Sequence, residues 1–179
     1  MAGTTRCSRL LLAALAAAPL VAGCATTQVR VVQRTAVDRT RASIYVIVYE
    51  CADDPYAAGH ARKLSAAMMN ALGPHTGARW STVLTGLEFD TRSVDQQMDS
   101  LGAQAVLTLK PIGARTDRYG ETVALVYGAT LTDRPSNQPL WAAKAEISGT
   151  VDLGIQDVAD KIVADLARDH MIGPVVASN

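Results

Sequence analysis

A single segment, residues 43–50 (SIYVIVYE), restricts the possible folds most, because almost every residue in it is β-branched or aromatic. Residues of these types favour a strand. Alternate side chains of a strand point to opposite faces, and here both faces are apolar: Ile44, Val46 and Val48 lie on one, and Tyr45, Ile47 and Tyr49 on the other. The segment is therefore predicted to be a buried strand.

Capping and spacing signals divide the rest of the chain into further helices and strands. A helix is expected from Asp54 and Pro55, an N-cap acid followed by a first-turn proline, to Gly73. A second, short helix opens with the capping box Ser93-Val94-Asp95-Gln96 and ends at Gly102. The remaining elements are a last helix over residues 154–170 and strands over 79–87, 104–112, 121–132 and 140–148.

The order of these elements, β-α-β-α-β-β-β-α, predicts the fold class. The early βαβ crossovers indicate parallel strands, and the last two strands flank a turn at 133–137 and form an antiparallel hairpin. We therefore expect an α/β (α+β) domain over residues 42–172, with a single mixed β-sheet and helices mainly on one face. Residues 24–41 are interpreted as a tether, in which Val29–Val32 could instead add an edge strand. Residues 173–179 are interpreted as a flexible tail.

The N-terminal residues 1–23 have the pattern of a secretory signal peptide. Arg6 and Arg9 precede an unbroken run of small and apolar residues from Leu10 to Ala22. The run from Leu10 to Leu20 is too short to span a bilayer, which needs about 20 residues, and Pro19 interrupts a helix there. We therefore expect residues 1–23 to be removed on export.

The end of this segment, Val21-Ala22-Gly23-Cys24, resembles the lipobox of bacterial lipoproteins. The resemblance implies cleavage between Gly23 and Cys24 and attachment of lipid, palmitate included, to Cys24. Ala25, which is not an aspartate, implies the outer membrane as destination, with the domain facing the periplasm. Two or more acyl chains give a stable membrane anchor. The alternative is an ordinary secretory signal cut after Ala25, in which Cys24 has no role.

The charge balance argues against a nucleic-acid-binding protein, and the number of cysteines argues against an intramolecular disulfide in the mature chain. With 17 basic and 17 acidic residues, the chain lacks the basic surface that nucleic-acid binding requires. Cys7 leaves with the signal peptide and Cys24 carries lipid, so Cys51 has no partner for an intramolecular disulfide.

A second resemblance concerns the folded part of the chain. The element order, and the phrase LGAQAVL at 101–107 that leads from helix to strand, are similar to those of small periplasmic lipoprotein domains. These domains resemble the N-terminal domain of TolB and occur also in lipoproteins of the LpoB and CsgG type. The resemblance covers roughly residues 42–172, and no functional residue is carried over from it.

No catalytic or metal-binding pattern stands out from the residues. Cys51 has no recognisable nucleophile signature around it, and His60, His75 and His170 lack the spacing of helical metal ligands. Two carboxylate pairs, Asp53 with Asp54 and Asp95 with Asp99, are better explained as a helix cap and a solvated helix face. We therefore expect no enzyme activity, no metal and no cofactor.

One face of the predicted sheet carries more apolar side chains than a face exposed to water should carry. If the helices cover one face, the other presents Tyr45, Ile47, Tyr49, Val106 and Val126, and a large exposed apolar patch marks a contact surface. The competing explanation is that the tether or a loop covers these residues, or that the register is displaced by one.

Three hypotheses for function follow from the sequence. The favoured one is a non-enzymatic outer-membrane lipoprotein that binds another envelope protein or itself through this face, in envelope assembly or maintenance. The second is a carrier or chaperone for lipid or lipopolysaccharide, with the apolar face as a groove. The third, and least favoured, is a hydrolase of envelope polymers.

Overall fold

A computed structural model of the chain describes residues 25–37, 39–50, 59–76, 78–84, 91–120, 122–149 and 151–175. They form one six-stranded mixed sheet and three helices, so the predicted α/β class and the single mixed sheet are confirmed. The elements in chain order are β1 (Thr26–Arg34), β2 (Ser43–Tyr49), α1 (His60–Leu72), β3 (Ala78–Leu84), α2 (Thr91–Ser100), β4 (Ala105–Thr116), β5 (Thr122–Asp133), β6 (Pro139–Ser148) and α3 (Val151–Arg168).

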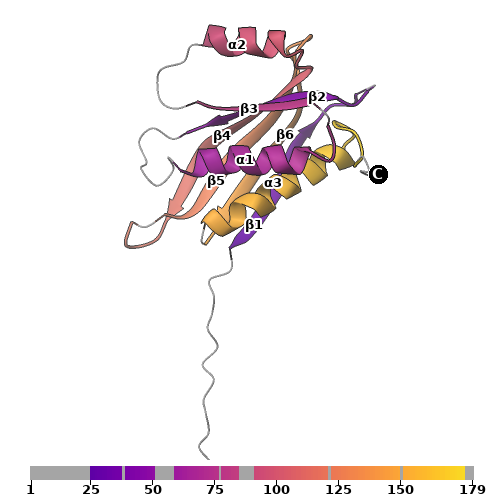
Figure 1. The fold of residues 1–179 in the computed structure, drawn as a ribbon. Coiled ribbons are helices and arrows are strands. Elements are labelled where there is room, and N and C mark those ends of the chain that lie inside the picture. Colours follow the sequence, from indigo (N-terminus) through magenta and orange to yellow (C-terminus); the bar gives the residue numbers. More distant parts are fainter. Residues whose placement is uncertain are drawn as a thin grey trace, which may run out of the picture.

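The sheet has the strand order β1-β6-β5-β4-β2-β3, with β2 inside it (Figure 1). β2 pairs in parallel with both β3 and β4, while β4, β5 and β6 form an antiparallel meander. This is the predicted pattern, because helical crossovers connect the parallel strands and short turns connect the antiparallel ones.

The first strand corrects the prediction of a tether over residues 24–41. Residues 26–34 form β1, which pairs antiparallel with β6 from Thr26↔Ser148 to Arg34↔Trp141. The edge strand left open as an alternative at Val29–Val32 is therefore present and is longer than expected. Its period-two valines explain it, because Val29 and Val31 pack on the core while Thr26, Gln28 and Arg30 are exposed.

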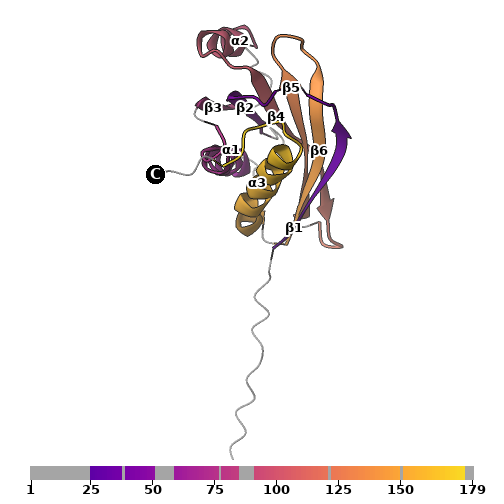
Figure 2. The same cartoon turned by 90° about the vertical axis from the view of Figure 1, so that its right-hand side faces the viewer.

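α1 and α3 cover one face of the sheet, while α2 lies across the other (Figures 1 and 2). The expectation of helices mainly on one face holds for two of the three. The chain moves from β2 to β3 in one direction across the sheet and from β3 to β4 in the opposite direction. Two right-handed crossovers that run in opposite directions place their helices on opposite faces.

The principal core lies between the sheet and the pair α1 and α3. The inward faces predicted for the hairpin strands are buried there, including Tyr127 and Leu131 of β5 and Trp141 and Ile147 of β6. Trp141 is fully buried, and its indole Nε1 donates a hydrogen bond to Asp169 at 2.9 Å. The alternation in these strands therefore identified the core correctly.

One predicted helix start is wrong, and the other lies outside the described residues. α1 begins at His60 after Gly59, and the expected cap, Asp54, lies outside the described residues. α2 begins at Thr91, so Ser93 is inside the helix and the capping-box pattern does not mark its start. α3 ends in a turn where His170 takes a φ of 59°. The His170 and Met171 amides donate to the carbonyls of Ala167 and Leu166 there, the usual arrangement after a helix C-terminus.

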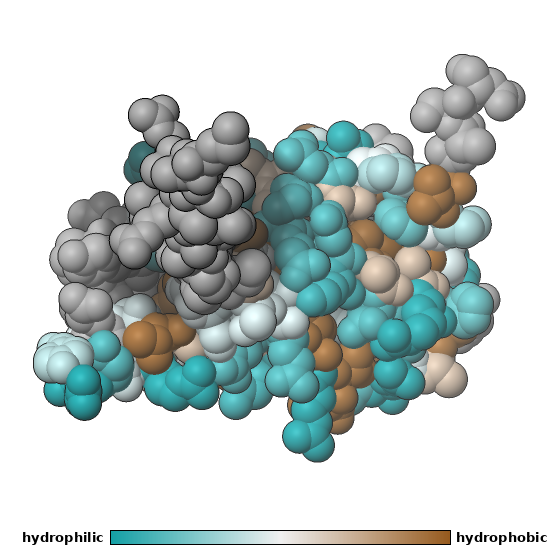
Figure 3. Space-filling model, turned by 90° about the horizontal axis from the view of Figure 1, so that it is seen from below, coloured by the Kyte–Doolittle hydropathy of each residue, from teal (hydrophilic) through white to brown (hydrophobic). Residues whose placement is uncertain are grey.

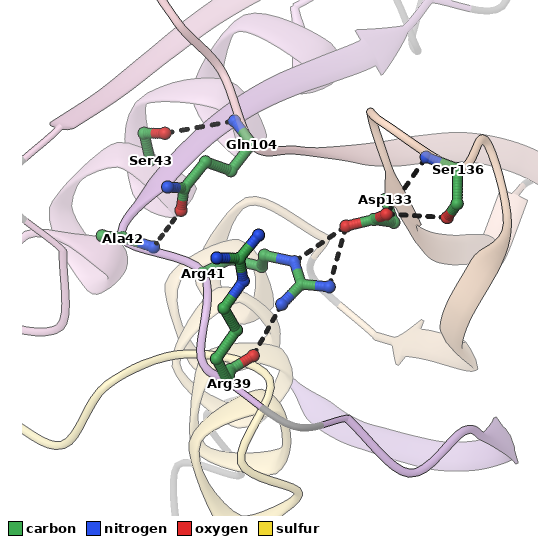
Figure 4. Close-up of polar contacts among 7 residues, drawn as sticks. All are labelled: Arg39, Arg41, Ala42, Ser43, Gln104, Asp133 and Ser136. Carbon is green, nitrogen blue, oxygen red and sulfur yellow. Dashed lines mark hydrogen bonds and ion pairs between the residues drawn. The ribbon is translucent and has the colours of Figure 1, made fainter.

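A buried ion pair fastens the chain before β2 to the β5–β6 turn (Figure 4). Arg41 contacts Asp133 through Nε at 2.9 Å and Nη2 at 2.8 Å, and the Ser136 hydroxyl donates to Asp133 at 2.6 Å. The bond from Ser136 and the charge of Arg41 together hold the pKa of Asp133 below its ordinary value. On the same side, the Ala42 amide donates to the side chain of Gln104 at 2.9 Å.

Candidate binding surface

The apolar face predicted as a contact surface is largely covered by α2. Tyr45, Ile47 and Val106 are 1%, 7% and 8% exposed and pack together with Met98 of α2. The register prediction was right, because Tyr45 and Val106 are cross-strand neighbours on one face. The prediction of exposure was wrong for these three residues, because the crossover helix α2 buries them.

Polar contacts hold α2 in this position. The Tyr45 hydroxyl donates to Gln97 Oε1 at 2.7 Å, and burial raises the pKa of that hydroxyl. Arg134, from the β5–β6 turn, contacts Asp95 at 3.3 Å and also pairs with Asp99. Asp95 and Asp99, interpreted in the sequence as a solvated helix face, thus connect α2 to the β5–β6 turn.

The part of this face beyond α2 is open, and we define it as the open face: the outward side chains of β1, β6 and β5 and of the second half of β4. No helix covers it in the described part of the chain (Figure 2). Val126 belongs to the open face and is half-buried. Tyr49 is also half-buried, and the centre of its ring lies 4.5 Å from Lys110 Nζ in a cation–π contact. Two of the five predicted face residues therefore keep accessible surface.

Two exposed aliphatic residues on the open face were missed by the sequence analysis. Val32 is 66% exposed at a bulge of β1 where the pairing with β6 shifts, and Ile112 is 59% exposed at a bulge of β4. Ile112 lies over Gly128, whose missing side chain leaves room for it. A bulge turns an extra side chain to one face, so strand alternation alone does not reveal such positions.

Charged residues surround these aliphatic side chains. Arg30 and Lys144 are cross-strand neighbours, and both are exposed. Arg115 lies 3.7 Å from Glu146, which also accepts a hydrogen bond from Ser148. The open face is therefore mixed, with a few apolar side chains inside a polar border.

The outer edge of β1 borders the open face. β1 ends the strand order, and no described strand pairs with its outer side. Lys161 of α3 reaches it, with Nζ 3.0 Å from the carbonyl oxygen of Thr27 and 2.8 Å from Asp157. An open hollow of about 310 Å³ lies between this edge and α3, lined by Thr27, Gln28, Val29, Lys161, Ala164 and Asp165.

The histidines have local roles. His60 Nε2 lies 3.2 Å from Asp152, and His75 Nδ1 lies 2.9 Å from the carbonyl oxygen of Gly173. Among the described residues, no three His, Cys, Asp or Glu side chains gather as metal ligands would. Gly23, Cys24, Cys51 and Asp53 lie outside the described residues, so cleavage and lipid attachment stay predictions. No described helix has both the length and the hydropathy to cross a bilayer.

Comparisons with known proteins show a likeness in fold to solved structures. No protein-family model and no curated protein matches the chain. The PelC dodecamer from Paraburkholderia phytofirmans is 18% identical with a TM-score of 0.49, over 80% of this chain and 97% of that chain. Lipoprotein GNA1162 from Neisseria meningitidis is 17% identical with a TM-score of 0.42, over 71% and 99%. Likenesses at this level carry no conclusion about activity or assembly.

Proposed function

We propose that this chain is a lipid-anchored protein of the bacterial outer membrane whose domain faces the periplasm and works by binding a protein. The bound protein is another envelope component or a second copy of the chain, and the role is non-enzymatic. The lipobox-like residues Val21–Cys24 support the anchor. The open face, which exposes Val32 beside the free edge of β1 and Ile112 on β4, supports binding and is the observation that carries this part of the proposal.

The position of these side chains matters more than their exposure. Single exposed aliphatic residues are common on soluble domains. Here Val32 and Ile112 share one uncovered sheet face, and that face adjoins a strand whose outer backbone groups have no strand partner among the described residues. An unpaired strand edge can pair with another chain where charges, bulges or a covering element do not block it.

Replacement of Cys24 by serine tests the anchor. We expect Cys24→Ser to abolish labelling with radioactive palmitate and to release the chain from the outer-membrane fraction, because an oxygen does not form the thioether. Cys51→Ser is the matched control and should label as the wild type does. A Cys24→Ser chain that still labels and sediments with the outer membrane contradicts the anchor.

Replacement of Val32 by arginine tests the binding surface. We expect Val32→Arg to reduce self-association, measured by light scattering, or capture of an envelope protein in cross-linked cells, because a desolvated charge opposes close contact. Val175→Arg is the matched control, since Val175 is 61% exposed and lies away from the open face, near the C-terminus. The proposal is wrong if both variants associate as the wild type does, or if the wild type neither associates nor captures a protein.

The two other hypotheses lose part of their basis. A lipid carrier needs the apolar face as a groove, but α2 packs against Tyr45, Ile47 and Val106. Mass spectrometry of lipids that purify with the chain tests this hypothesis directly. The hydrolase hypothesis would use Cys51 or the acids, and of these Asp95 and Asp99 pair with Arg134.

A further inference from the structure

The fold begins immediately after the cysteine that the lipobox marks. Ala25 follows Cys24 directly, and β1 begins at Thr26. A methyl group placed on Gly154, in the first turn of α3, would lie 3.5 Å from Cβ of Ala25 and 2.9 Å from Cγ2 of Thr27. These two residues thus lie against α3. Because consecutive Cα atoms are about 3.8 Å apart, an acylated Cys24 would leave almost no spacer between lipid and domain.

One end of the domain surrounds the point where β1 begins, and we call it the anchor end. Pairing places Thr26 beside Ser148 and Ser148 beside Ala124, while Thr116 pairs with Thr122. The β4–β5 turn and the start of α3 are therefore at the same end as the start of β1. Figures 1 and 2 agree, since both views show these segments beside the start of β1.

The anchor end exposes two large apolar side chains. Tyr119, in the β4–β5 turn, is 73% exposed, and Leu153, in the first turn of α3, is 68% exposed. Side chains of a helix lean toward its N-terminus, so Leu153 leans toward this end. The guanidinium of Arg118 lies 4.7 Å from the centre of the Tyr119 ring, and the Tyr119 amide donates to Asp117 at 2.8 Å, which orders the turn.

The chemistry of this end matches the boundary between lipid headgroups and acyl chains. Seen from this end, hydrophobic side chains lie among hydrophilic ones on the part of the surface that is drawn in colour (Figure 3). Tyrosine places an apolar ring beside a polar tip, and arginine keeps its charge at the headgroups while its stem contacts apolar surface. A mixed surface of this kind suits shallow contact with a bilayer, to a depth of about 5–10 Å.

We propose that the anchor end lies directly on the phospholipid leaflet that holds the lipid anchor, with Tyr119 and Leu153 in the headgroup region and Arg118 at the lipid phosphates. This inference rests on the proposed anchoring through Cys24. The strands of the sheet then lead away from the membrane, and the open face looks sideways along it. Copies anchored in one leaflet would meet through their open faces without leaving the membrane.

Depth-dependent fluorescence quenching tests this orientation. The acylated mature chain, purified from membranes, is placed in vesicles of phosphatidylethanolamine and phosphatidylglycerol that contain lipids with either a shallow or a deep nitroxide label. We compare Tyr119→Trp and Leu153→Trp with the parent chain, whose Trp80 and Trp141 supply the common background. Gln138→Trp is the matched control, because Gln138 is exposed in the β5–β6 turn at the opposite end of the same strands.

We expect Tyr119→Trp and Leu153→Trp to be quenched more than the parent, and more by shallow than by deep labels, whereas Gln138→Trp equals the parent. Mass spectrometry of each sample records whether Cys24 is acylated. If the chain is acylated and the three variants are quenched equally, the orientation is wrong and the anchor stands. If Cys24 carries no acyl group, the anchor and the orientation are both wrong.

Discussion

Trp141→Ala should lower the free energy of unfolding by about 3–5 kcal/mol, as truncation of a large buried aromatic residue does. Trp141 is 0% exposed and lies in the core between the sheet and the helices α1 and α3. The substitution leaves a cavity that the rigid sheet cannot fill, and it removes the hydrogen bond to Asp169. Urea unfolding followed by far-ultraviolet circular dichroism measures the change.

Trp141→Phe separates the two contributions. Phenylalanine keeps most of the ring but loses the indole N–H, and the side chain of Asp169 keeps its contact with Arg34 at 2.8 Å. We therefore expect a smaller loss of unfolding free energy for Trp141→Phe than for Trp141→Ala. The indole hydrogen bond accounts for about 1.5–3 kcal/mol, because its acceptor is charged. Equal stability of Trp141→Ala and the wild type would place the inward face of β6 at the surface and contradict the described core.

Asp133→Asn should lower the free energy of unfolding by about 2–4 kcal/mol at neutral pH, because it leaves Arg41 charged and without its carboxylate. The side chains of Arg41 and Asp133 are each only 12% exposed, so water replaces the lost contact poorly. Asp160→Asn is the control, since Asp160 is exposed and accepts only a hydrogen bond from Gln156 among the contacts described. That change should stay within about 0.5 kcal/mol.

The pH dependence of stability gives an independent test of Asp133. Its pKa is lowered in the folded chain, first by the hydrogen bond from the Ser136 side chain and further by Arg41. A carboxyl group with a lowered pKa stabilises the fold fully above its unfolded value, near pH 4, and this stabilisation is lost as the pH falls through the folded value. The wild type and Asp133→Asn should therefore differ most above pH 4 and approach each other in stronger acid. A difference that does not change with pH contradicts the ion pair.

Much of the fold was predictable because its strands and helices have strong periodic patterns. The inward residues of β5 and β6 alternate without interruption, so their buried face follows from the period of two. The strand at residues 43–50 is apolar on both faces, and the structure covers it on both, with α1 and α3 on one face and α2 on the other. These features are predictable because they depend only on the pattern of neighbouring residues.

The candidate surface depended on information that the sequence does not carry. The side on which α2 packs follows from the strand order β4-β2-β3, which reverses the direction of the second crossover. An amphipathic helix such as α2 carries an apolar stripe that fits either face of a sheet, so its sequence does not choose between them. As a result, Tyr45, Ile47 and Val106 belong to the core, and the exposed surface moves to β1, β6, β5 and the second half of β4.

By itself, the sequence determined the class of fold, the inward faces of the hairpin strands and the expected lipid attachment at Cys24. Only the tertiary structure decided that residues 26–34 join the sheet and that Val32 and Ile112 turn outward. It also decided that the domain begins beside α3, one residue after Cys24. The physical reason is that an edge strand needs a partner edge and a bulge needs a register, and both depend on residues of another strand. Thr26 pairs with Ser148, and the bulge at Ile112 lies between the pairs that Pro111 and Gly113 make with Tyr127 and Val126.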